Sequence, residues 1–351
     1  MLYWKRLHGI AFEWRFTSMP RTRVCLVGCG TAAERYYIPA LTKLATLWDE
    51  VVFVDTDLAR AERLAAAFPR ANAAQDYRTL IGTVQGAILV VPHALHHPLS
   101  KEFLEAGAHV LCEKPLAETS GQADEMIAAA AAGGVTLSVN NTRRMFPSFR
   151  EVKRLIAEGA IGRPSSLTYY EGNSFAWPSA TPFYVDPRAT SKGVLLDVGA
   201  HVLDTVCWWL GGKPELRECR DDSFGGPESV TRVRAALNAC EVEVFLSRLY
   251  ELCNRYRVEG DEGVIAGDIF RWDAVTLTPR GGTPRKIALS GSVRAYPEFV
   301  TPILGNFLKV VRGETPPEIP AAAVRDSVAL IEECYAARRR FPMPWCENLE
   351  V

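Results

Sequence analysis

The sequence predicts an α/β protein with two domains: a doubly wound parallel sheet, followed by an α+β domain with an open-faced, mainly antiparallel sheet. Three observations carry this prediction. Short apolar runs alternate with helical segments up to residue 139, which is typical of a parallel sheet covered on both faces. A glycine-rich turn follows the first run. Beyond residue 164, strand-like runs follow one another between turns, with one long helical segment among them.

The composition excludes several classes of protein. The chain has 351 residues, 48% of them hydrophobic and 23% charged, and its net charge is −1. These values are typical of a soluble globular protein of about two domains. They give no electrostatic signature for nucleic acid or an anionic membrane, and no run of about 18 apolar residues predicts a membrane span. The nine cysteines form no CxxC pair, which favours reduced thiols and a cytoplasmic location.

The first domain is expected over residues 21–141, after an N-terminal extension over residues 1–20. The extension lacks the long apolar stretch of a signal peptide; it is either a docking strand or the product of an upstream start. Residues 23–27 form the first strand, and a glycine turn and a helix follow. This strand, turn and helix bind dinucleotides in the Rossmann fold, because the helix N-terminus offers free N–H donors to a pyrophosphate. The candidate cofactor residues of this turn are Gly28, Gly30, Thr31 and Ala32.

The second strand, residues 50–54, ends in Asp55. Asp55 follows the glycine turn by roughly 20–25 residues, the spacing of a carboxylate that binds the ribose of NAD. The alternative is that Asp55 or Asp57 only caps the helix over 58–68; we assign the cap to Asp57 and the ribose to Asp55. A carboxylate about 4 Å from a 2′-phosphate costs on the order of 4 kcal/mol at an effective dielectric constant of about 20. NAD is therefore expected rather than NADP, although nearby Arg60 weakens the preference.

Three further strands are expected over 87–91, 108–112 and 135–139, with helices over 99–106 and 117–132 between them. The strand over 87–91 stops at proline, and the strand over 108–112 stops at Glu-Lys-Pro. The carboxyl ends of parallel strands share the ligand-binding edge of an open sheet, so we expect cofactor contacts there. They are Val91, Pro92, His96, Glu113 and Lys114. The histidines at 93, 96 and 97 have no acid or thiol close in sequence, so no metal is expected.

The second domain is expected over 142–316, with a C-terminal helix and tail over 317–351. Its helix over 194–210 is apolar nearly all round except at Asp197, His201 and Asp204, which share one stripe at i, i+4 and i+7. Buried acids and a histidine need partners or a cavity. The stripe therefore predicts a proton-transfer site in which a carboxylate orients the histidine. A capped first turn with a satisfied core histidine is the structural alternative.

Taken together, these segments resemble the glucose–fructose oxidoreductase / inositol dehydrogenase family (Gfo/Idh/MocA) over about residues 20–340. The resemblance depends on a few short motifs in this order along the chain. They are Gly28-Cys29-Gly30, Asp76-Tyr77, Val91-Pro92 with His96, Glu113-Lys114-Pro115, and the segment Leu196-Asp197-Val198-Gly199-Ala200-His201.

The resemblance implies hydride transfer between a nicotinamide cofactor and a hydroxyl carbon of a sugar or cyclitol, by a homodimer or homotetramer that assembles through the C-terminal sheet. It implies that His201 is the acid/base, that Lys114 holds the reacting oxygen, and that Asp197 positions the substrate and supports His201. Arg144 corresponds to an arginine near the domain junction and is a candidate substrate contact.

Two residues outside these motifs are also candidate substrate contacts. Lys192, where the family often has glycine, is a candidate for an anionic substrate group, with a solvated lysine as the alternative. Trp177 is a candidate aromatic wall for a sugar face, with a packed loop as the alternative. Two other functions stay open: a reductase of a nucleotide-linked or otherwise anionic sugar, and a non-catalytic NAD-binding regulatory protein.

Overall fold

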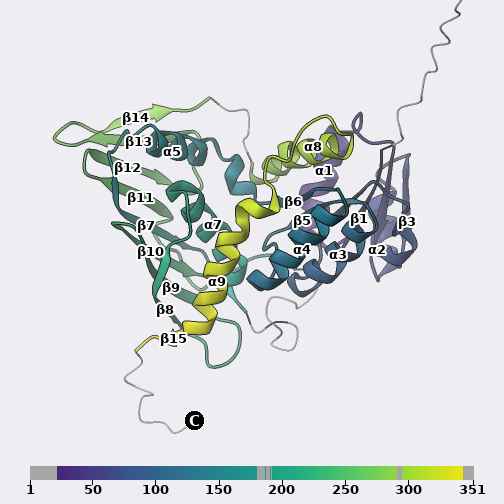
Figure 1. Cartoon of the computed structure of the whole chain (residues 1–351), viewed down its shortest axis with the longest axis horizontal. Coiled ribbons are helices and arrows are strands. Elements are labelled where there is room, and N and C mark those ends of the chain that lie inside the picture. Colours follow the sequence, from purple (N-terminus) through teal and green to yellow (C-terminus); the bar gives the residue numbers. More distant parts are fainter. Residues whose placement is uncertain (1–21, 180–185, 187–189, 191, 291–294, 343–351) are drawn as a thin grey trace, which may run out of the picture.

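The computed structural model describes residues 22–179, 186, 190, 192–290 and 295–342. Within them, two sheets lie side by side with helices between and around them (Figure 1). The predicted N-terminal extension over residues 1–20 lies outside the described residues. No helix in the described part of the chain combines the length and the apolar character that crossing a membrane requires.

The first sheet has six parallel strands in the order β3-β2-β1-β4-β5-β6, the strand order of a Rossmann fold. Their interiors are the continuous apolar runs of the sequence, and most of their residues are buried. The strands are β1 (Arg23–Val27), β2 (Glu50–Val54), β3 (Ala71–Ala74), β4 (Gly86–Leu89), β5 (His109–Glu113) and β6 (Leu137–Asn140).

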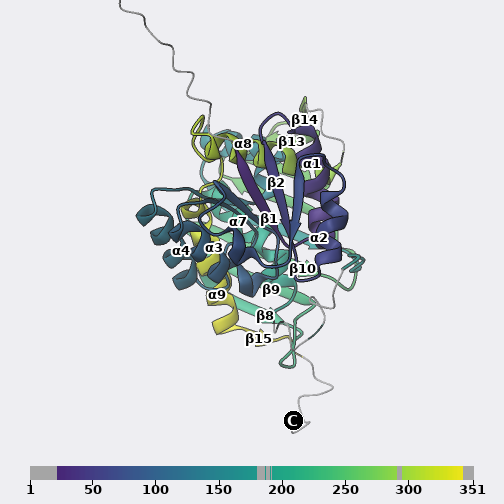
Figure 2. The ribbon, with the colours of Figure 1, turned by 90° about the vertical axis from the view of Figure 1, so that its right-hand side faces the viewer.

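Helices cover both faces of this sheet, as a doubly wound fold requires. Figure 2 shows α1 (Ile38–Lys43) and α2 (Leu58–Ala65) on one side, with α3 (His96–Glu105) and α4 (Ser120–Ala132) on the other. A π-helical segment, η1 (Ala33–Tyr37), leads from the glycine turn into α1. Pro39 at the start of α1 has no N–H to donate to the preceding turn, which fits this irregular helix.

The second sheet is mainly antiparallel, in the order β14-β13-β12-β11-β7-β10-β9-β8-β15. Two of its strand pairs are parallel, β10 with β7 and β15 with β8. Its strands are β7 (Pro164–Gly172), β8 (Glu215–Asp221), β9 (Val230–Leu237), β10 (Cys240–Ser247), β11 (Arg255–Gly260), β12 (Gly263–Asp268), β13 (Ala274–Pro279), β14 (Arg285–Ala288) and β15 (Arg339–Arg340). The predicted combination of a parallel sheet with a mainly antiparallel one is confirmed.

The helices of the second half lie on the side of this sheet that faces the first sheet (Figure 1). They are α5 (Pro147–Ala157), α6 (Val194–Asp197), α7 (Gly199–Leu210) and α9 (Arg325–Ala337). The single helix that the sequence predicts over 194–210 is thus divided at Val198, because Val198 lies in a turn between α6 and α7.

The chain forms two hydrophobic cores and returns to the first one late in the sequence. Helix α8 (Val300–Val311) packs in the core of the first sheet, although it follows all the long strands of the second. The short segments η4 (Thr142–Met145), η6 (Tyr296–Phe299) and η7 (Ala321–Val324) connect the two cores. Both halves of the chain therefore border the carboxyl edge of the first sheet.

Candidate active site

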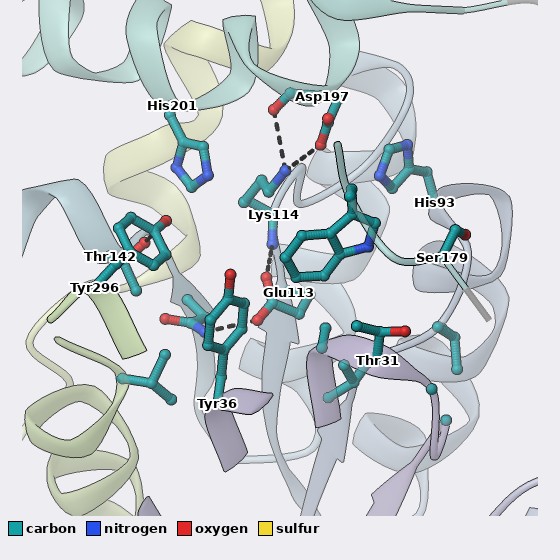
Figure 3. A pocket seen from close by; sticks show the side chains of 18 of the residues that line it. Thr31, Tyr36, His93, Glu113, Lys114, Thr142, Ser179, Asp197, His201 and Tyr296 are labelled. Atoms are coloured by element: carbon teal, nitrogen blue, oxygen red, sulfur yellow. Dashed lines mark hydrogen bonds and ion pairs between the residues drawn. The ribbon is translucent and has the colours of Figure 1, made fainter. Parts of the chain in front are cut away.

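A cavity of about 530 Å³ lies at the carboxyl edge of the first sheet, between that edge and helices α6 and α7. The glycine turn and Asp55 line one end, and Asp197 and His201 line the other. Figure 3 shows Lys114 beside Asp197, with His201 on one side and His93 on the other. The predicted residues that line the cavity are Gly28, Gly30, Thr31, Ala32, Asp55, Val91, Pro92, Glu113, Lys114, Trp177, Asp197 and His201.

The glycine turn has the shape that a dinucleotide needs. Gly28 has a φ of +95°, and a Cβ there would lie 2.2 Å from the carbonyl oxygen of Val90, so a larger residue does not fit. A Cβ at Gly30 would meet nothing within 4 Å, because Gly30 borders the cavity. The helix that starts at Thr31 directs its N-terminus at the same space, which suits a pyrophosphate.

Asp55 is held in a fixed position beside this turn. Its Oδ2 accepts a hydrogen bond from the backbone N–H of Cys29 at 2.8 Å, and its Oδ1 accepts one from the N–H of Asp57 at 2.9 Å. Asp57 is the N-cap residue of α2 but makes no side-chain cap bond; it pairs with Arg60 at 3.1 Å instead. The residues at this end of the cavity fit the adenosine half of a nicotinamide dinucleotide.

A three-residue ion cluster lies at the other end of the cavity. The Nζ of Lys114 is 2.5 Å from Oδ1 of Asp197 and donates to the Asp197 carbonyl oxygen at 3.0 Å. Oδ2 of Asp197 accepts from Arg248 at 2.5 Å. Burial opposes ionisation of Asp197, but the two cations hold the pKa of its carboxyl well below its usual range. Asp197 is therefore an anion shared between two cations.

His201 has a different partner from the one expected. Its Nδ1 lies 3.1 Å from the amide oxygen of Asn141, and no hydrogen bond among the described residues joins it to Asp197. An amide oxygen only accepts, so Nδ1 carries the proton and Nε2 keeps its lone pair. Burial, together with the charges of Lys114 and Arg143, lowers the pKa of His201 well below 6.5. His201 is thus neutral at pH 7.

Glu113 closes the floor of the cavity next to Lys114. Its Oε1 accepts hydrogen bonds from Tyr37 at 2.8 Å and from Asn140 at 2.7 Å, and its Oε2 accepts from the N–H of Lys114 at 3.1 Å. Burial raises the pKa of this carboxyl despite these donors. Its contacts fix the turn at which Lys114 leaves β5.

Aromatic side chains form one wall of the cavity. The ring of Tyr36 lies 5.8 Å from that of Trp177 and 5.7 Å from that of Tyr296. The segment that carries Trp177 also reaches the glycine turn, where the Thr31 hydroxyl donates to the carbonyl oxygen of Pro178 at 2.6 Å. Trp177 therefore lies in the cavity wall, and its loop covers part of the cofactor end.

Three predicted contacts lie elsewhere. His96 is fully buried beneath the cavity, with its ring nitrogens 2.6 Å from the carbonyl oxygen of Pro115 and 2.9 Å from that of Val91. His96 thus bridges the segments that follow β4 and β5, and the neighbouring His93 lines the cavity instead. Lys192 lies 3.4 Å from the Glu118 carboxylate, outside the cavity-lining set. His96 and Lys192 therefore lie outside the cavity lining, and a cofactor contact at His96 and a substrate contact at Lys192 stay predictions.

Arg144 is the third. Its guanidinium forms a bidentate pair with Asp204 at 2.8 and 2.7 Å and donates to the carbonyl oxygen of Ala323 at 2.7 Å. This buried pair removes both Arg144 and Asp204 from the cavity. The predicted stripe of Asp197, His201 and Asp204 is thus divided. Asp197 and His201 face the cavity, and Asp204 stabilises the packing of α7 against η4.

Sequence reasoning missed Arg143, Glu171 and Arg248. Arg143 lines the cavity and forms a bidentate pair with Glu171 at 2.6 and 2.7 Å, while its guanidinium also donates to Tyr169 at 2.8 Å. Glu171 and Arg248 come from the ends of β7 and β10, which pair in parallel. The double arginine at 143 and 144 was visible in the sequence, but nothing local showed which of the two faces the cavity.

Comparison with known proteins gives a consistent result. Residues 22–141 match the family model described as "Oxidoreductase family, NAD-binding Rossmann fold", and residues 149–266 match the "GFO/IDH/MocA C-terminal domain". Inositol 2-dehydrogenase 4 of Saccharopolyspora erythraea is 32% identical over 236 residues, or 64% of this chain and 67% of the relative. 1,5-Anhydro-D-fructose reductase of Ensifer adhaerens is 29% identical over 252 residues, or 69% and 74%.

Solved structures agree in fold. An oxidoreductase from Agrobacterium radiobacter, in complex with NAD⁺, L-tartaric acid and magnesium, superposes with a TM-score of 0.77 at 18% identity, covering 90% of this chain and 96% of its own. A 3-ketoreductase from Actinomadura kijaniata, in complex with NADP and TDP-benzene, gives 0.77 at 22% identity, covering 92% and 100%. These neighbours bind different nicotinamide cofactors.

Proposed function

The chain belongs to the Gfo/Idh/MocA oxidoreductase family, and we propose that it transfers hydride between NAD and a hydroxyl or keto carbon of a sugar or cyclitol. One observation carries the proposal. Lys114 has three N–H donors, and Asp197 accepts from two of them. No other acceptor among the described residues bonds to this ammonium, so its third N–H can donate to a substrate oxygen in the cavity, at the same end as the unprotonated Nε2 of His201.

The residues divide the work as follows. When bound, the nicotinamide takes up or delivers the hydride. In the oxidative direction, Nε2 of His201 accepts the hydroxyl proton, and its lowered pKa keeps it ready to do so at neutral pH. Lys114 stabilises the negative charge that develops on the same oxygen. Asp197 orients Lys114 through two contacts and does not need to touch His201.

Asp55 supports NAD as the cofactor. Its fixed carboxylate lies where the adenosine ribose is expected, and it repels a 2′-phosphate at that position. The aromatic wall of Tyr36, Trp177 and Tyr296 suits the apolar faces of a sugar or cyclitol ring. A phosphate contact at Lys192 was the feature that favoured an anionic sugar, and Lys192 lies outside the cavity-lining set.

Two further proposals concern the setting of the enzyme. We propose a homodimer or homotetramer that assembles through the face of the second sheet opposite its helices, which light scattering on the purified protein tests. We also propose a cytoplasmic location. The eight cysteines within the described residues are all free, which suits a reducing compartment.

The test is a panel of sugars and cyclitols followed by NADH absorbance, with variants of the two reacting groups. His201→Ala and Lys114→Met should each lower kcat at least about a hundredfold, because a positioned acid/base contributes roughly 10²–10⁴ in rate. NADH affinity should stay unchanged in both. Matched controls are His97→Ala and Lys101→Met, whose side chains pair with Glu125 away from the cavity. Turnover near that of the wild type in His201→Ala or Lys114→Met contradicts the proposal.

A further inference from the structure

A buried carboxylate accepts hydrogen bonds from the free backbone N–H groups at the start of α6. Glu228 is 1% exposed and precedes β9. Its two carboxylate oxygens accept from the N–H of Gly193, each at 3.0 Å, and Oε1 also accepts from the N–H of Leu195 at 2.9 Å. Its backbone carbonyl accepts from Val194 at 2.9 Å. Three successive N–H groups at this helix start therefore bond to one residue.

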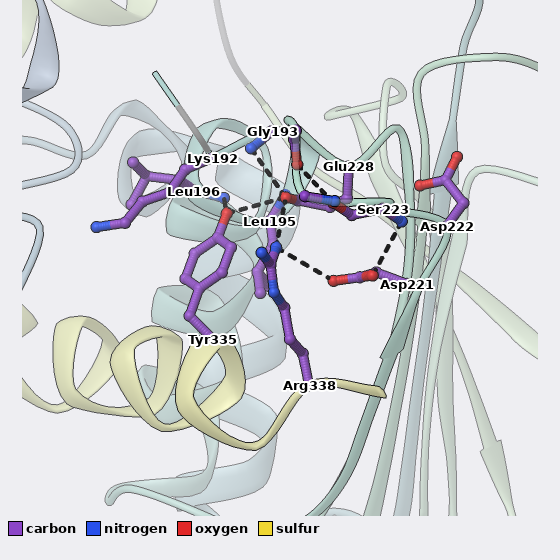
Figure 4. A network of polar contacts seen from close by, with 12 residues as sticks. Lys192, Gly193, Leu195, Leu196, Asp221, Asp222, Ser223, Glu228, Tyr335 and Arg338 are labelled. Carbon is purple, nitrogen blue, oxygen red and sulfur yellow. Dashed lines mark hydrogen bonds and ion pairs between the residues drawn. The ribbon is translucent and has the colours of Figure 1, made fainter. Parts of the chain in front are cut away.

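Tyr335 on α9 satisfies the next N–H. Its hydroxyl accepts from the backbone N–H of Leu196 at 3.1 Å and donates to Oε1 of Glu228 at 2.9 Å (Figure 4). Arg338, one residue past the end of α9, lies 3.7 Å from the Glu228 carboxylate. A helix start leaves four N–H groups without intrahelical partners. Here Glu228 and Tyr335 account for all four, from Gly193 to Leu196.

The approach is close enough to require glycine at the first of these positions. A Cβ at Gly193 would lie 1.8 Å from the carbonyl oxygen of Glu228 and 2.6 Å from its nitrogen. Both atoms are backbone, so they cannot move aside as the end of a flexible side chain does. Gly193 and Glu228 thus dock α6 on the second sheet backbone to backbone.

The other end of α6 is Asp197. This helix is a single turn of four residues that continues through Val198 into α7, so the contacts of Glu228 and Tyr335 hold its other, N-terminal end. Lys114 donates to the carbonyl oxygen of Asp197 as well as to its carboxylate, so a displacement of the backbone of α6 moves both acceptors of the ammonium. The hydroxyl of Tyr335 accepts its hydrogen bond from the N–H of Leu196, the residue directly before Asp197.

We propose that Glu228 and Tyr335 form a positioning site, through which the C-terminal helix α9 fixes α6 and so sets the place of the Lys114–Asp197 pair. This inference rests on the proposed function of that pair. Neither residue lines the cavity, so both act through Asp197 and not on the substrate. A displacement of about 1 Å at a reacting centre lowers the rate by roughly a hundredfold, which makes the position of α6 matter for turnover.

The variant Tyr335→Phe tests this most directly, because it removes one oxygen and keeps the ring. Leu196 then loses its acceptor and Glu228 one donor. We expect amide hydrogen exchange of the peptide over 193–198 to rise at least about tenfold, and kcat to fall at least about tenfold with the NADH dissociation constant unchanged. Glu228→Gln, which keeps one carbonyl acceptor, should change both in the same direction.

The matched control is Tyr77→Phe. Tyr77 also donates its hydroxyl to a glutamate, Glu102 at 3.0 Å, but in the first domain and away from the cavity. Its loss should leave exchange over 193–198 and kcat unchanged. Wild-type exchange in Tyr335→Phe, or a kcat no lower than that of the control, overturns the inference.

Hydrogen exchange separates this inference from the proposed function, because it is measured without substrate. A second such measurement is the rate at which Lys114 is acetylated by acetic anhydride, read by mass spectrometry. If the wild type turns over no sugar or cyclitol while Tyr335→Phe raises both exchange and Lys114 acetylation, the positioning site stands and the proposed function falls. If turnover is found and neither measurement changes, the positioning site falls alone.

Discussion

Replacing Asp55 with asparagine should change which nicotinamide cofactor the enzyme prefers. The two N–H groups of Cys29 and Asp57 hold the carboxylate, so it cannot swing away from a ligand beside the glycine turn. Asparagine has nearly the same shape and keeps an oxygen acceptor for one of these groups. The substitution therefore removes the charge and one of these two hydrogen bonds, because the asparagine NH₂ cannot accept from the other N–H.

The magnitude follows from the charges. A carboxylate about 4 Å from one phosphate charge costs on the order of 4 kcal/mol at an effective dielectric constant of about 20. Since about 1.4 kcal/mol corresponds to a factor of ten, the full effect is close to a thousandfold against NADP. Arg60 lines the same cavity and attracts a phosphate, although Asp57 engages it at 3.1 Å. We therefore expect Asp55→Asn to lower the preference for NAD by roughly a hundredfold.

Two assays read this change. The ratio of kcat/KM for NAD and NADP gives the preference during turnover, and the fluorescence of bound NADH and NADPH gives the ratio of dissociation constants without any substrate. Asp49→Asn is the matched control, because its carboxylate also accepts a backbone N–H, that of Thr22 at 2.8 Å, next to the opposite end of β2. A ratio that changes less than about threefold in Asp55→Asn refutes the reasoning, since it corresponds to well under 1 kcal/mol. Asp55 would then only hold the turn.

Two other perturbations follow from the electrostatics of the site. Arg248→Met leaves Asp197 with Lys114 alone; we expect the pKa of Asp197 to rise and the free energy of unfolding to fall by up to about 3 kcal/mol, with partial recovery in Arg248→Lys. Urea unfolding checks this, and an unchanged midpoint in Arg248→Met contradicts it. Burial lowers the pKa of His93, His96 and His201 below 6.5, so the unfolded chain binds more protons than the folded one below that pH. Each of these three histidines should therefore lower the free energy of unfolding by up to roughly 1.4 kcal/mol per pH unit as the pH falls below about 6.5. His93→Gln should remove one of these contributions, so its free energy of unfolding should fall less between pH 7.5 and 5.5 than that of the wild type. An equal fall in the variant and the wild type would contradict this.

Much of the fold was predictable because its signals are local. Continuous apolar runs that end in polar or cyclic residues mark β1, β2, β4 and β5, and the glycine turn marks the start of the first helix. The place of α8 was not predictable in this way. An apolar helical stretch shows that a helix is buried, but not which of two cores buries it, and α8 packs in the first core from the far end of the chain.

The candidate site shows the same division. Lys114 and His201 stand out by their positions in the sequence, at a strand end and in an apolar helix. Their partners come from elsewhere: Asn141 follows β6, and Arg248 follows β10. Arg143 and Arg144 are adjacent in η4, yet one faces the cavity and the other a buried aspartate. The packing of α7 on that turn decides which arginine faces the cavity and which pairs with Asp204.

The partners of the two side chains explain why Asp197 does not orient His201: the carboxylate is bonded to Lys114 and Arg248, and Nδ1 of the imidazole to Asn141. In one continuous helix, residues i and i+4 lie one above the other, and a carboxylate there would pair with the imidazole and raise its pKa. Val198 keeps helical backbone angles, with φ −79° and ψ −40°, so this spacing is retained, but the carboxylate bonds to Lys114 and Arg248 instead. As a result, the negative charge serves the ammonium that holds the oxygen, and the imidazole stays neutral next to an amide. A base that must accept a hydroxyl proton at pH 7 needs to be unprotonated, and this separation provides that condition.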